Sequence, residues 1–328
     1  MLVPNFHSSI ASLEQHALAS VRMRSALIAR AAENAAWKVT LGERFDTHPK
    51  VLYVGKIGGY RIESRGPAWL EYMAKAQAHG SRVIVDYTDH HCGFKSAMNT
   101  FYTHAIALAD ELITPSAMMT QQISTMSFGR VTEIPDPCEV EPAPPRAPGL
   151  GPWRALWFGS CTNISYLIDF LSSPNNLSQL RQLNVVTDTT GISILKQWSR
   201  SINPVTTSPV IESFTWSLKN LTVAAAKSDI ALIPSDPNDP RKAGVSENRL
   251  VTALQLGLVT VASPLPAYLP LSNLFVKLNY GWGDAVLHSD PTNSIACGTR
   301  SQMLGTYSKS AMMARWTALL DSQTQHLH

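Results

Sequence analysis

The feature that most constrains the fold is a proline-rich segment near the middle of the chain. Residues 134–153 read IPDPCEVEPAPPRAPGLGPW. Proline fixes the backbone angle φ and lacks an amide hydrogen, so this segment is expected to be an extended connector outside any sheet or helix. The chain has 328 residues, which is long for one domain of about 100–200 residues. We therefore predict an N-terminal domain over residues 1–136, a linker over 137–152, a C-terminal domain over 153–299, and a final helix over 300–328 that packs back toward the N-terminal domain.

Short segments rich in β-branched and aromatic residues alternate with segments of helical periodicity on both sides of the linker. The predicted strands are 37–43, 50–57, 81–88, 111–116, 130–136, 154–160, 183–188, 210–215, 229–235 and 258–264. The predicted helices are 10–35, 66–79, 95–109, 115–127, 163–172, 191–200, 218–227, 246–256 and 300–322. Such alternation is typical of a parallel sheet with helices on both faces. The predicted fold class is therefore α/β, with two Rossmann-like doubly wound domains that face each other across a ligand-binding cleft.

The composition is that of an ordinary folded protein. Hydrophobic residues make up 45% and charged residues 16% of the chain, and the formal net charge is +3. These values argue against extensive disorder and against a global field that attracts nucleic acid. The four cysteines have no C-x-x-C spacing, and a reducing compartment is their simplest setting. No signal-peptide pattern and no apolar run of ~20 residues is present, so we expect a cytoplasmic protein without a transmembrane segment, whose contact with the inner membrane face would be peripheral.

Two motifs of the C-terminal half place small and aromatic residues at predicted strand ends. In WFGSCTN, a strand turns through Gly159 and Ser160 into a helix. Glycine lets the backbone approach a ligand closely, and a helix N-terminus offers amide groups to an anion. In FTWSLKN, Trp216 is a candidate to stack on a nucleobase. A plain tight turn and a core tryptophan are the structural alternatives for these motifs.

The segment DPRKAGVSENRLVTALQLG, residues 239–257, crowds basic and polar residues before an apolar helix. Lys242 lies in the preceding loop, and Ser246 and Asn248 are candidates to cap the helix. Arg249 lies in the first helical turn, where the helix dipole disfavours a cation. A bound anion at this helix end would offset that cost and so explain the position of Arg249. A solvated Arg249 is the alternative.

In the N-terminal half, VIVDYTDHHCG brings Asp86, Asp89, His90 and His91 to the carboxyl end of a predicted strand. Group transfer to a hydroxyl needs a base or polar groups that hold the hydroxyl, so Asp89, His90 and His91 are the candidate catalytic residues. The same residue types fit a metal site, and a capping aspartate with a packed histidine is the structural alternative. Basic residues that are candidates to contact an anionic acceptor are Arg22, Arg24, Arg61 and Arg65.

The ordered series of motifs resembles the GT-B glycosyltransferases of the family-4 and family-1 type, which use nucleotide sugars. SDIALIPSDPNDPRKAGVSENRLVTALQLGLVTVASPLPAY is similar to their donor-binding segment, LWFGSCTN to the first strand and turn of their C-terminal domain, and ADELITPSAMMTQQI and VTEIPDP to the end of their N-terminal domain. The resemblance spans most of residues 81–270 and implies a nucleotide-diphosphate sugar as donor substrate, with no other cofactor and no metal. It places the base near Trp216. It places the diphosphate near Gly159, Ser160, Lys242, Ser246, Asn248 and Arg249.

The chain departs from this family at a pair of glutamates that the family carries eight positions apart. Counted from the first helical residues, the pair falls on Asp239 and Glu247. Aligned on Gly257, it falls on Gly244 and Thr252. The second register preserves the following strand better, so the glutamate that would hold the ribose is missing, and Glu247 is the candidate substitute. The stereochemical course therefore stays open.

The sequence thus predicts a glycosyltransferase that moves a sugar from a nucleotide-diphosphate sugar to a hydroxyl acceptor, such as a sugar, a glycan or a lipid-linked group. Three alternatives stay open: a non-catalytic binding or scaffold protein with this fold, a nucleotide-sugar epimerase, and a transferase that acts on a nucleic-acid base. The small net charge does not favour a nucleic-acid acceptor.

Overall fold

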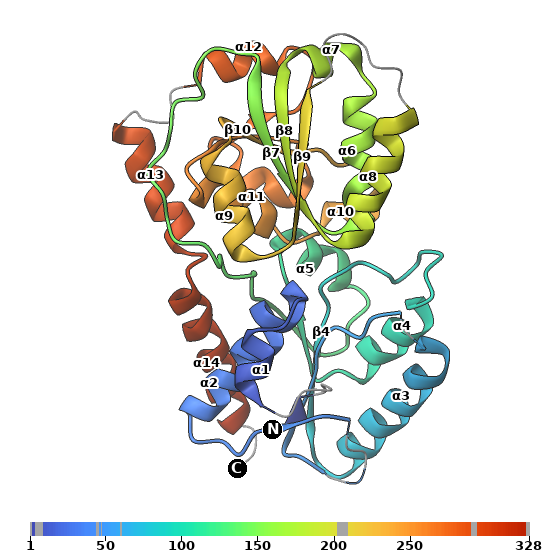
Figure 1. The fold of residues 1–328 in the computed structure, drawn as a ribbon. Coiled ribbons are helices and arrows are strands. Elements are labelled where there is room, and N and C mark those ends of the chain that lie inside the picture. The colour runs from blue at the N-terminus through green and yellow to red at the C-terminus, as the bar shows by residue number, and fades with distance from the viewer. Residues whose placement is uncertain are drawn as a thin grey trace. The chain divides into compact units, whose positions relative to one another are not determined.

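A computed structural model of the chain describes residues 2–3, 9–43, 46, 48–59, 61–201, 209–289 and 294–325. The chain divides into two compact units (Figure 1). The first unit comprises Met1–Pro137, Ala243–Ser246 and Ser308–His328, and the second comprises Cys138–Lys242 and Glu247–Tyr307. Each unit contains a six-stranded sheet in which the paired strands run parallel.

The sheet of the first unit has the strand order β2-β1-β3-β4-β5-β6. Its strands are β1 (Leu2–Val3), β2 (Thr40–Leu41), β3 (Val51–Val54), β4 (Arg82–Asp86), β5 (Glu111–Thr114) and β6 (Arg130–Glu133). The helical segments are α1 (Ile10–Glu14), the π-helix η1 (Val21–Ser25), α2 (Ala26–Asn34), α3 (Ile62–Ala78), α4 (Asn99–Leu108), α5 (Ala117–Ile123) and α14 (Lys309–Gln325).

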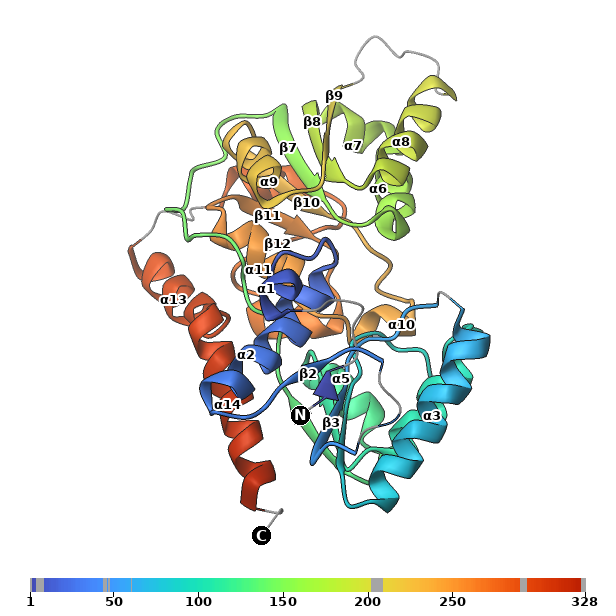
Figure 2. The same ribbon diagram turned by 60° about the horizontal axis from the view of Figure 1, so that its bottom comes forward.

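Alternate residues of the strands in the first unit pack against helices on opposite faces of the sheet. In β3, Val51 and Tyr53 belong to the core formed with α2 and α14, whereas Leu52 and Val54 belong to the core formed with α3 and α4. Figure 2 shows α2 and α14 side by side, with α3 on the other side of the sheet. Because successive strand residues point to opposite faces, a continuous apolar run such as VLYV is what a doubly covered strand requires.

A buried ionic network joins the π-helix to two strand ends of the first unit. The Arg24 side chain is 1% exposed, and its Nε donates to both carboxylate oxygens of Asp86, at 2.8 and 2.7 Å. Its Nη1 donates to Asp136 Oδ1 at 2.9 Å, and its guanidinium lies over the ring of Trp316. Although burial opposes the charge, these two carboxylates raise the pKa of Arg24. The expectation that Arg24 contacts an anionic acceptor is wrong, since Asp86 and Asp136 already neutralise it.

The sheet of the second unit has the strand order β12-β11-β10-β7-β8-β9. Its strands are β7 (Trp153–Phe158), β8 (Leu180–Thr187), β9 (Val210–Thr215), β10 (Ile230–Ile233), β11 (Val259–Ala262) and β12 (Val276–Lys277). Its helical segments are η2 (Cys161–Asn163), α6 (Ile164–Leu171), α7 (Pro174–Ser178), α8 (Thr189–Ser201), α9 (Leu218–Ala226), α10 (Pro240–Ala243), α11 (Asn248–Gln255), η3 (Pro266–Leu271), α12 (Trp282–Leu287) and α13 (Ser294–Gly305).

The strand order of the second unit reverses between β7 and β10. From β7 the chain proceeds to β8 and β9 on one side, and it then returns to β10 and β11 on the other. Helices α6 and α8 lie on one side of this sheet and α9 and α11 on the other (Figure 1). In open α/β sheets, ligands bind at the carboxyl ends of the strands where this reversal occurs. The segments after β7 and β10 are therefore where a site is expected.

The proline-rich segment has no regular secondary structure between β6 and β7, as the prolines predict. It is nevertheless held by the second unit, because Ala143 N donates to Gln255 O at 2.7 Å and Arg146 N donates to Gly257 O at 2.9 Å. Gly257 ends α11 with a φ of +78°, and a Cβ there would overlap the carbonyl oxygen of Pro144. Glycine at this position therefore allows the left-handed backbone conformation that ends the helix and leaves room for the linker backbone beside it.

The single helix expected over residues 300–322 is two helices. Helix α13 ends at Gly305, and α14 begins at Lys309 after Ser308, whose Oγ accepts from Ala311 N at 3.2 Å. A glycine at a helix end followed by a serine cap are the local signals for such a break. Among the described residues, no helix is both long and apolar enough to cross a bilayer.

Candidate functional site

Two cationic side chains of the second unit contact the segment that follows β7. Arg249 from the first turn of α11 lies against Gly159, and Lys242 from α10 contacts Asn163. Both basic groups therefore meet the residues of the WFGSCTN motif at the carboxyl end of a central strand. We call Gly159, Ser160, Asn163, Lys242 and Arg249 the cationic site.

Two aromatic rings and the backbone of Gly159 cover part of the Arg249 guanidinium. Its Cζ lies 5.3 Å from the ring centre of Trp157 and 5.8 Å from that of Phe158. A Cβ at residue 159 would lie 3.4 Å from Arg249 Cζ and Nε, so glycine leaves room for this close approach. No carboxylate approaches Arg249 in the part of the chain that the structure describes, and its Nε and Nη2 are buried without a hydrogen-bond partner there.

Burial lowers the pKa of Arg249 from its ordinary value, while Tyr268 works in the opposite direction. Burial also raises the pKa of Tyr268 to about 12, with Arg249 opposing the rise. A guanidinium remains protonated at neutral pH even after a substantial reduction of its pKa. Arg249 is thus a half-buried cation that forms no ion pair with a described carboxylate, whereas Arg24 of the first unit pairs with two.

Lys242 is half-buried beside the start of α6. Its Nζ lies 3.2 Å from Asn163 Oδ1 and 5.3 Å from the ring centre of Tyr166. The sequence suggested a loop at Lys242, but the structure places it in the short helix α10. The amide oxygen and the aromatic face orient the ammonium group.

The amide groups after β7 are less available than the sequence suggested. Cys161 N donates to Asp188 Oδ2 at 2.8 Å, and Thr162 N donates to Ser160 Oγ at 3.4 Å. Although burial opposes it, hydrogen bonds from the amides of Cys161 and Gly191 lower the pKa of Asp188. The expected anion site on free helix amides is therefore corrected. These amides hold the turn in shape, and the charge in the site comes from Lys242 and Arg249.

Trp216 follows β9 at the same edge of the sheet. Its amide donates to Thr187 O at 2.8 Å, and its half-buried indole stacks on Phe158 with ring centres 6.5 Å apart and planes 24° apart. Trp216, the predicted base-stacking residue, and Arg249, one of the two cations, therefore both contact Phe158.

Three other predicted residues surround the start of α11. Glu247 is the N-cap residue, is 4% exposed, and makes no side-chain capping bond. The expectation that Ser246 or Asn248 caps the helix is therefore wrong: Asn248 is the first helical residue, and Ser246 belongs to the segment counted with the first unit. In that segment, Ser116 Oγ donates to Gly244 O at 2.9 Å.

The predicted catalytic residues Asp89, His90 and His91 follow β4 of the first unit. Asp89 forms an ion pair with Lys56. His90 Nδ1 lies 2.9 Å from Tyr87 Oη, and His91 Nδ1 lies 3.0 Å from Ser96 Oγ. Burial lowers the pKa of both histidines, so their neutral forms predominate at pH 7.

The three residues differ in what they leave open to a ligand. His91 stacks on Tyr102 with planes 10° apart, and its Nε2 is buried. His90 Nε2 makes no hydrogen bond with any described residue. Asp89 does not cap α4, which begins after Met98. A search of the described residues finds no group of three His, Cys, Asp or Glu side chains placed to hold a metal ion.

Several contacts of the site could not be found by the sequence reasoning. Asn163, Tyr166 and Phe158 shape the cationic site, and Tyr268 lies beside Arg249. Asn163 and Phe158 stand within the WFGSCTN motif, which was the available signal. Tyr268 comes from η3, after the next strand, and only the fold brings it to Arg249.

Solved structures of glycosyltransferases are similar to the whole chain. A glycosyltransferase from Rickettsia africae ESF-5 gives a TM-score of 0.59 at 10% identity, over 99% of this chain and 98% of that one. AviGT4, a glycosyltransferase involved in avilamycin A biosynthesis, gives 0.55 at 11% identity, over 97% and 95%. An α-glucosyltransferase in complex with UDP gives 0.55 at 10% identity, over 87% and 86%. No protein-family model and no curated protein matches the chain.

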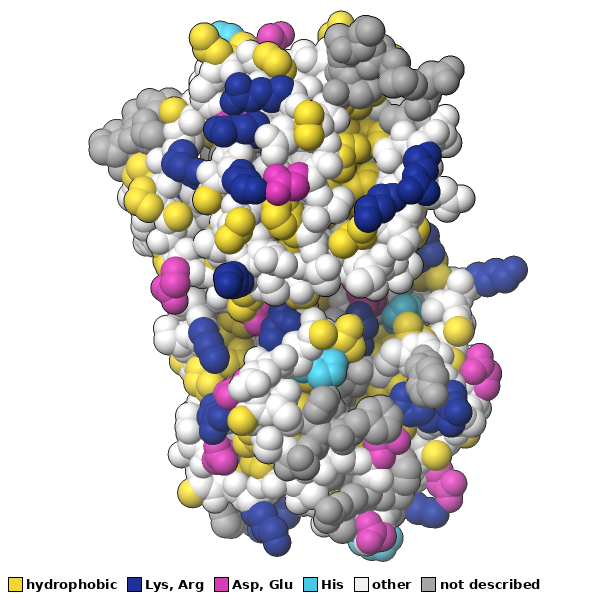
Figure 3. Space-filling view, viewed as in Figure 1, with side chains coloured by type: hydrophobic (Ala, Val, Ile, Leu, Met, Phe, Trp, Pro, Cys, Tyr) yellow, Lys and Arg dark blue, Asp and Glu magenta, His cyan; other side chains and the backbone are white. Residues whose placement is uncertain are grey.

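These likenesses confirm the predicted fold class. The chain has two Rossmann-like α/β units, and it shares the GT-B fold of these glycosyltransferases. On the face seen in Figure 3, lysine and arginine side chains lie singly or in small groups among uncharged and acidic ones. The cation pair around Gly159 is therefore distinguished by its place in the fold, and not by a broad basic surface.

Proposed function

We propose that this protein is a glycosyltransferase that transfers a sugar from a nucleotide-diphosphate sugar to a hydroxyl group of an acceptor. The observation that carries the proposal is Arg249, a half-buried side chain at the carboxyl edge of the sheet, whose guanidinium has two buried nitrogen atoms without partners among the described residues. A diphosphate supplies the missing negative charge and several hydrogen-bond acceptors. The shared GT-B fold supports a donor at this edge.

In the proposed donor complex, Lys242 and Arg249 bind the diphosphate and stabilise it as it leaves. The bond from the anomeric carbon to the phosphate oxygen breaks, and its electron pair goes to the diphosphate. Two cations already oriented by Asn163, Tyr166 and the rings of Trp157 and Phe158 lower the energy of that developing charge without reorganisation.

The proposed nucleobase position is beside Trp216. The indole is half-buried and already stacked on Phe158, so it offers one rigid face at low entropic cost. Stacking of a base on an aromatic side chain contributes about 1–3 kcal/mol. Because Phe158 also contacts Arg249, a nucleotide that binds both groups would follow the carboxyl edge from β9 to β7.

For the acceptor we propose a site in the first unit with His90 as the base. Its burial-lowered pKa keeps the ring neutral at pH 7, and its Nε2 is not used by any described residue. As the acceptor oxygen attacks the anomeric carbon, its proton passes to Nε2 of His90. Asp89, paired with Lys56, and His91, held by Ser96, position this loop.

We further propose that transfer needs no metal ion, because the two cations can take the role that a divalent cation has at other diphosphate sites. The sequence departure at Gly244 and Thr252 favours one competing function, a protein that binds the nucleotide without turning it over. Thr252 is 7% exposed within α11, so it cannot replace a carboxylate that holds a ribose.

The proposal is tested with the full-length protein and a panel of uridine, guanosine and adenosine diphosphate sugars. Thermal melts with each compound identify the donor, since a ligand at 100 times its Kd adds about 2.7 kcal/mol to the free energy of unfolding. Release of the nucleoside diphosphate, measured with and without excess EDTA, then reports turnover and metal dependence. A shift without release in the presence of diverse acceptors supports the non-catalytic alternative, and no shift with any donor refutes both.

A further inference from the structure

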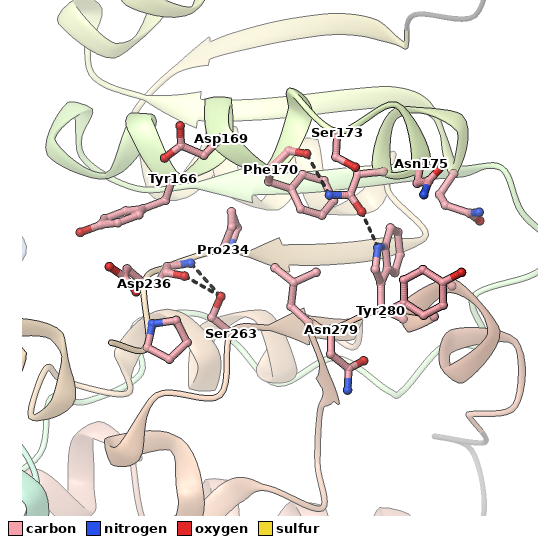
Figure 4. Close-up of a pocket in the computed structure, with 18 of the residues that line it drawn as sticks. Tyr166, Asp169, Phe170, Ser173, Asn175, Pro234, Asp236, Ser263, Asn279 and Tyr280 are labelled. Carbon is pink, nitrogen blue, oxygen red and sulfur yellow. Dashed lines mark hydrogen bonds between the residues drawn. The ribbon is translucent and has the colours of Figure 1, made fainter. Parts of the chain in front are cut away.

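A groove of about 860 Å³ runs along the second unit beside α6. In Figure 4, Tyr166 and Asp236 lie at one end of it, and Asn175 and Tyr280 lie at the other. Its volume falls in the range of small-ligand sites, about 300–1,000 Å³. The proposed donor complex does not use this groove.

The far end of the groove presents an aromatic ring to solvent. Tyr280 is 98% exposed, in the turn before α12, and is followed by Gly281 with a φ of +79°. Its neighbour Trp282 is 4% exposed and donates its indole hydrogen to Asn176 Oδ1 at 3.0 Å. Asn176 in turn donates to Phe170 O at 2.9 Å, so the base of the groove is braced between α6 and α12. The exposed Tyr280 ring therefore stands at the end of a groove whose base is held in place by these hydrogen bonds.

The polar side chains around the ring are acidic or uncharged. Asp169, Asp236 and Asp284 line the groove, and no lysine or arginine is among the described residues that line it. The carboxylates of Asp169 and Asp284 and the amide of Asn175 form no hydrogen bond or ion pair with other described residues. Carboxylates repel phosphates and sulfates, so this lining disfavours an anionic ligand.

The ligand that this chemistry fits is uncharged, carries many hydroxyl groups, and has an apolar face. Carboxylates accept hydrogen bonds from hydroxyls, and amides both donate and accept. The face of a pyranose that carries C–H bonds packs on an aromatic ring, as apolar groups do in other small-molecule sites. An apolar ligand would leave the carboxylates and amides without partners, at a cost of about 1–3 kcal/mol each.

We infer that the groove from Tyr166 to Tyr280 binds a short uncharged oligosaccharide, with Tyr280 as its stacking platform. The site is separate from the cationic site, and its occupancy does not require transferase activity. Tyr166 borders both, since its ring contacts Lys242 at one end of the groove. An oligosaccharide bound here would hold a longer glycan next to the cationic site.

The test measures binding of linear hexasaccharides by isothermal titration calorimetry on the full-length protein. The probes are the α-1,4- and β-1,4-linked glucose oligomers and the β-1,4-linked oligomers of N-acetylglucosamine, mannose and xylose. At least one of them is expected to bind, and Tyr280→Ala is expected to weaken it about tenfold, as loss of an aromatic contact does. Asp284→Ala is expected to weaken the same ligand.

Phe128→Ala is the matched control, because Phe128 is an aromatic residue that is 90% exposed in the first unit. It is expected to bind the hexasaccharide like the unsubstituted protein. Tyr280→Ala is expected to keep its melting temperature and its affinity for UDP, and Arg249→Met is expected to keep its affinity for the hexasaccharide. The inference is overturned if no hexasaccharide binds, if Tyr280→Ala and Phe128→Ala bind equally well, or if spermine binds in the groove and the sugars do not.

Discussion

Arg249→Met separates a ligand-binding role of this residue from a structural one. If the guanidinium serves only the fold, its removal should destabilise the protein. If it is kept for an anion, the ligand-free protein bears the cost of a buried charge without a counter-ion, and methionine, which fills a similar space, removes that cost. The two roles thus predict opposite signs for the change in the free energy of unfolding.

The magnitude follows from the contacts. Nε and Nη2 of Arg249 are buried without partners in the described structure, and each such donor costs about 1–3 kcal/mol. The contacts with the rings of Trp157 and Phe158 offset about 0.5–2 kcal/mol of this. Two such donors together cost about 2–6 kcal/mol, so after this offset we expect the free energy of unfolding without ligand to rise by about 3 kcal/mol, within a range of about 0–5 kcal/mol. Loss of charge-assisted hydrogen bonds to phosphate should weaken UDP at least about tenfold.

The assay is urea unfolding at fixed protein concentration, with and without UDP, supported by calorimetric titration of UDP. Arg181→Met is the control: it removes an arginine of the same unit that is 54% exposed and paired with Asp229, and it should change neither quantity by more than about 0.5 kcal/mol. A variant at Arg249 that unfolds more easily than the unsubstituted protein and binds UDP with the same affinity would refute the reasoning.

Three further predictions use other parts of the structure. Lys242→Ala should weaken UDP about tenfold while the free energy of unfolding stays within about 0.5 kcal/mol, measured by the same titration and urea series. Because burial lowers the pKa of His90 and His91, the unfolded chain takes up protons before the folded one does. The free energy of unfolding should therefore fall as the pH drops below about 6.5. In a double variant, His90→Gln with His91→Gln, the midpoint of urea unfolding should change less with pH than in the unsubstituted protein. Gly257→Ala should lower the free energy of unfolding by at least about 2 kcal/mol, because residue 257 has a positive φ and a Cβ there would displace the linker. The control Gly298→Ala, in a helix with open space around it, should not lower the free energy of unfolding.

Most of the fold could be predicted from the sequence because the strands are continuous apolar runs. Segments such as VLYV and IALI are buried at every position, which is the pattern of a parallel strand covered on both faces. The elements that were missed are short. Helices α7, α10 and α12 have 5, 4 and 6 residues, fewer than two turns, so hydrophobic periodicity has too few positions to show them.

The candidate site could be predicted in its residues and not in its contacts. Gly159, Lys242 and Arg249 lie in motifs that a glycine or a group of charged residues makes recognisable in the sequence. The sequence could not show that Arg24 is neutralised while Arg249 pairs with no described carboxylate, because the difference depends on which carboxylates the fold brings near each guanidinium. Burial of a charge is a property of tertiary structure, and the local sequence of an arginine carries little of it.

The net charge of +3 does not show that basic and acidic side chains gather at different places in the second unit. The cationic site brings two basic side chains to the carboxyl end of β7, whereas the groove beside α6 carries aspartates and no lysine or arginine among its described residues. Tyr166 contacts Lys242 and lines the groove, so the two environments meet at one side chain. A diphosphate is attracted to the first and repelled by the second, while an uncharged sugar chain is tolerated by both. Local charge would therefore keep the nucleotide out of the groove and leave the groove free for carbohydrate, a selection that total composition cannot predict.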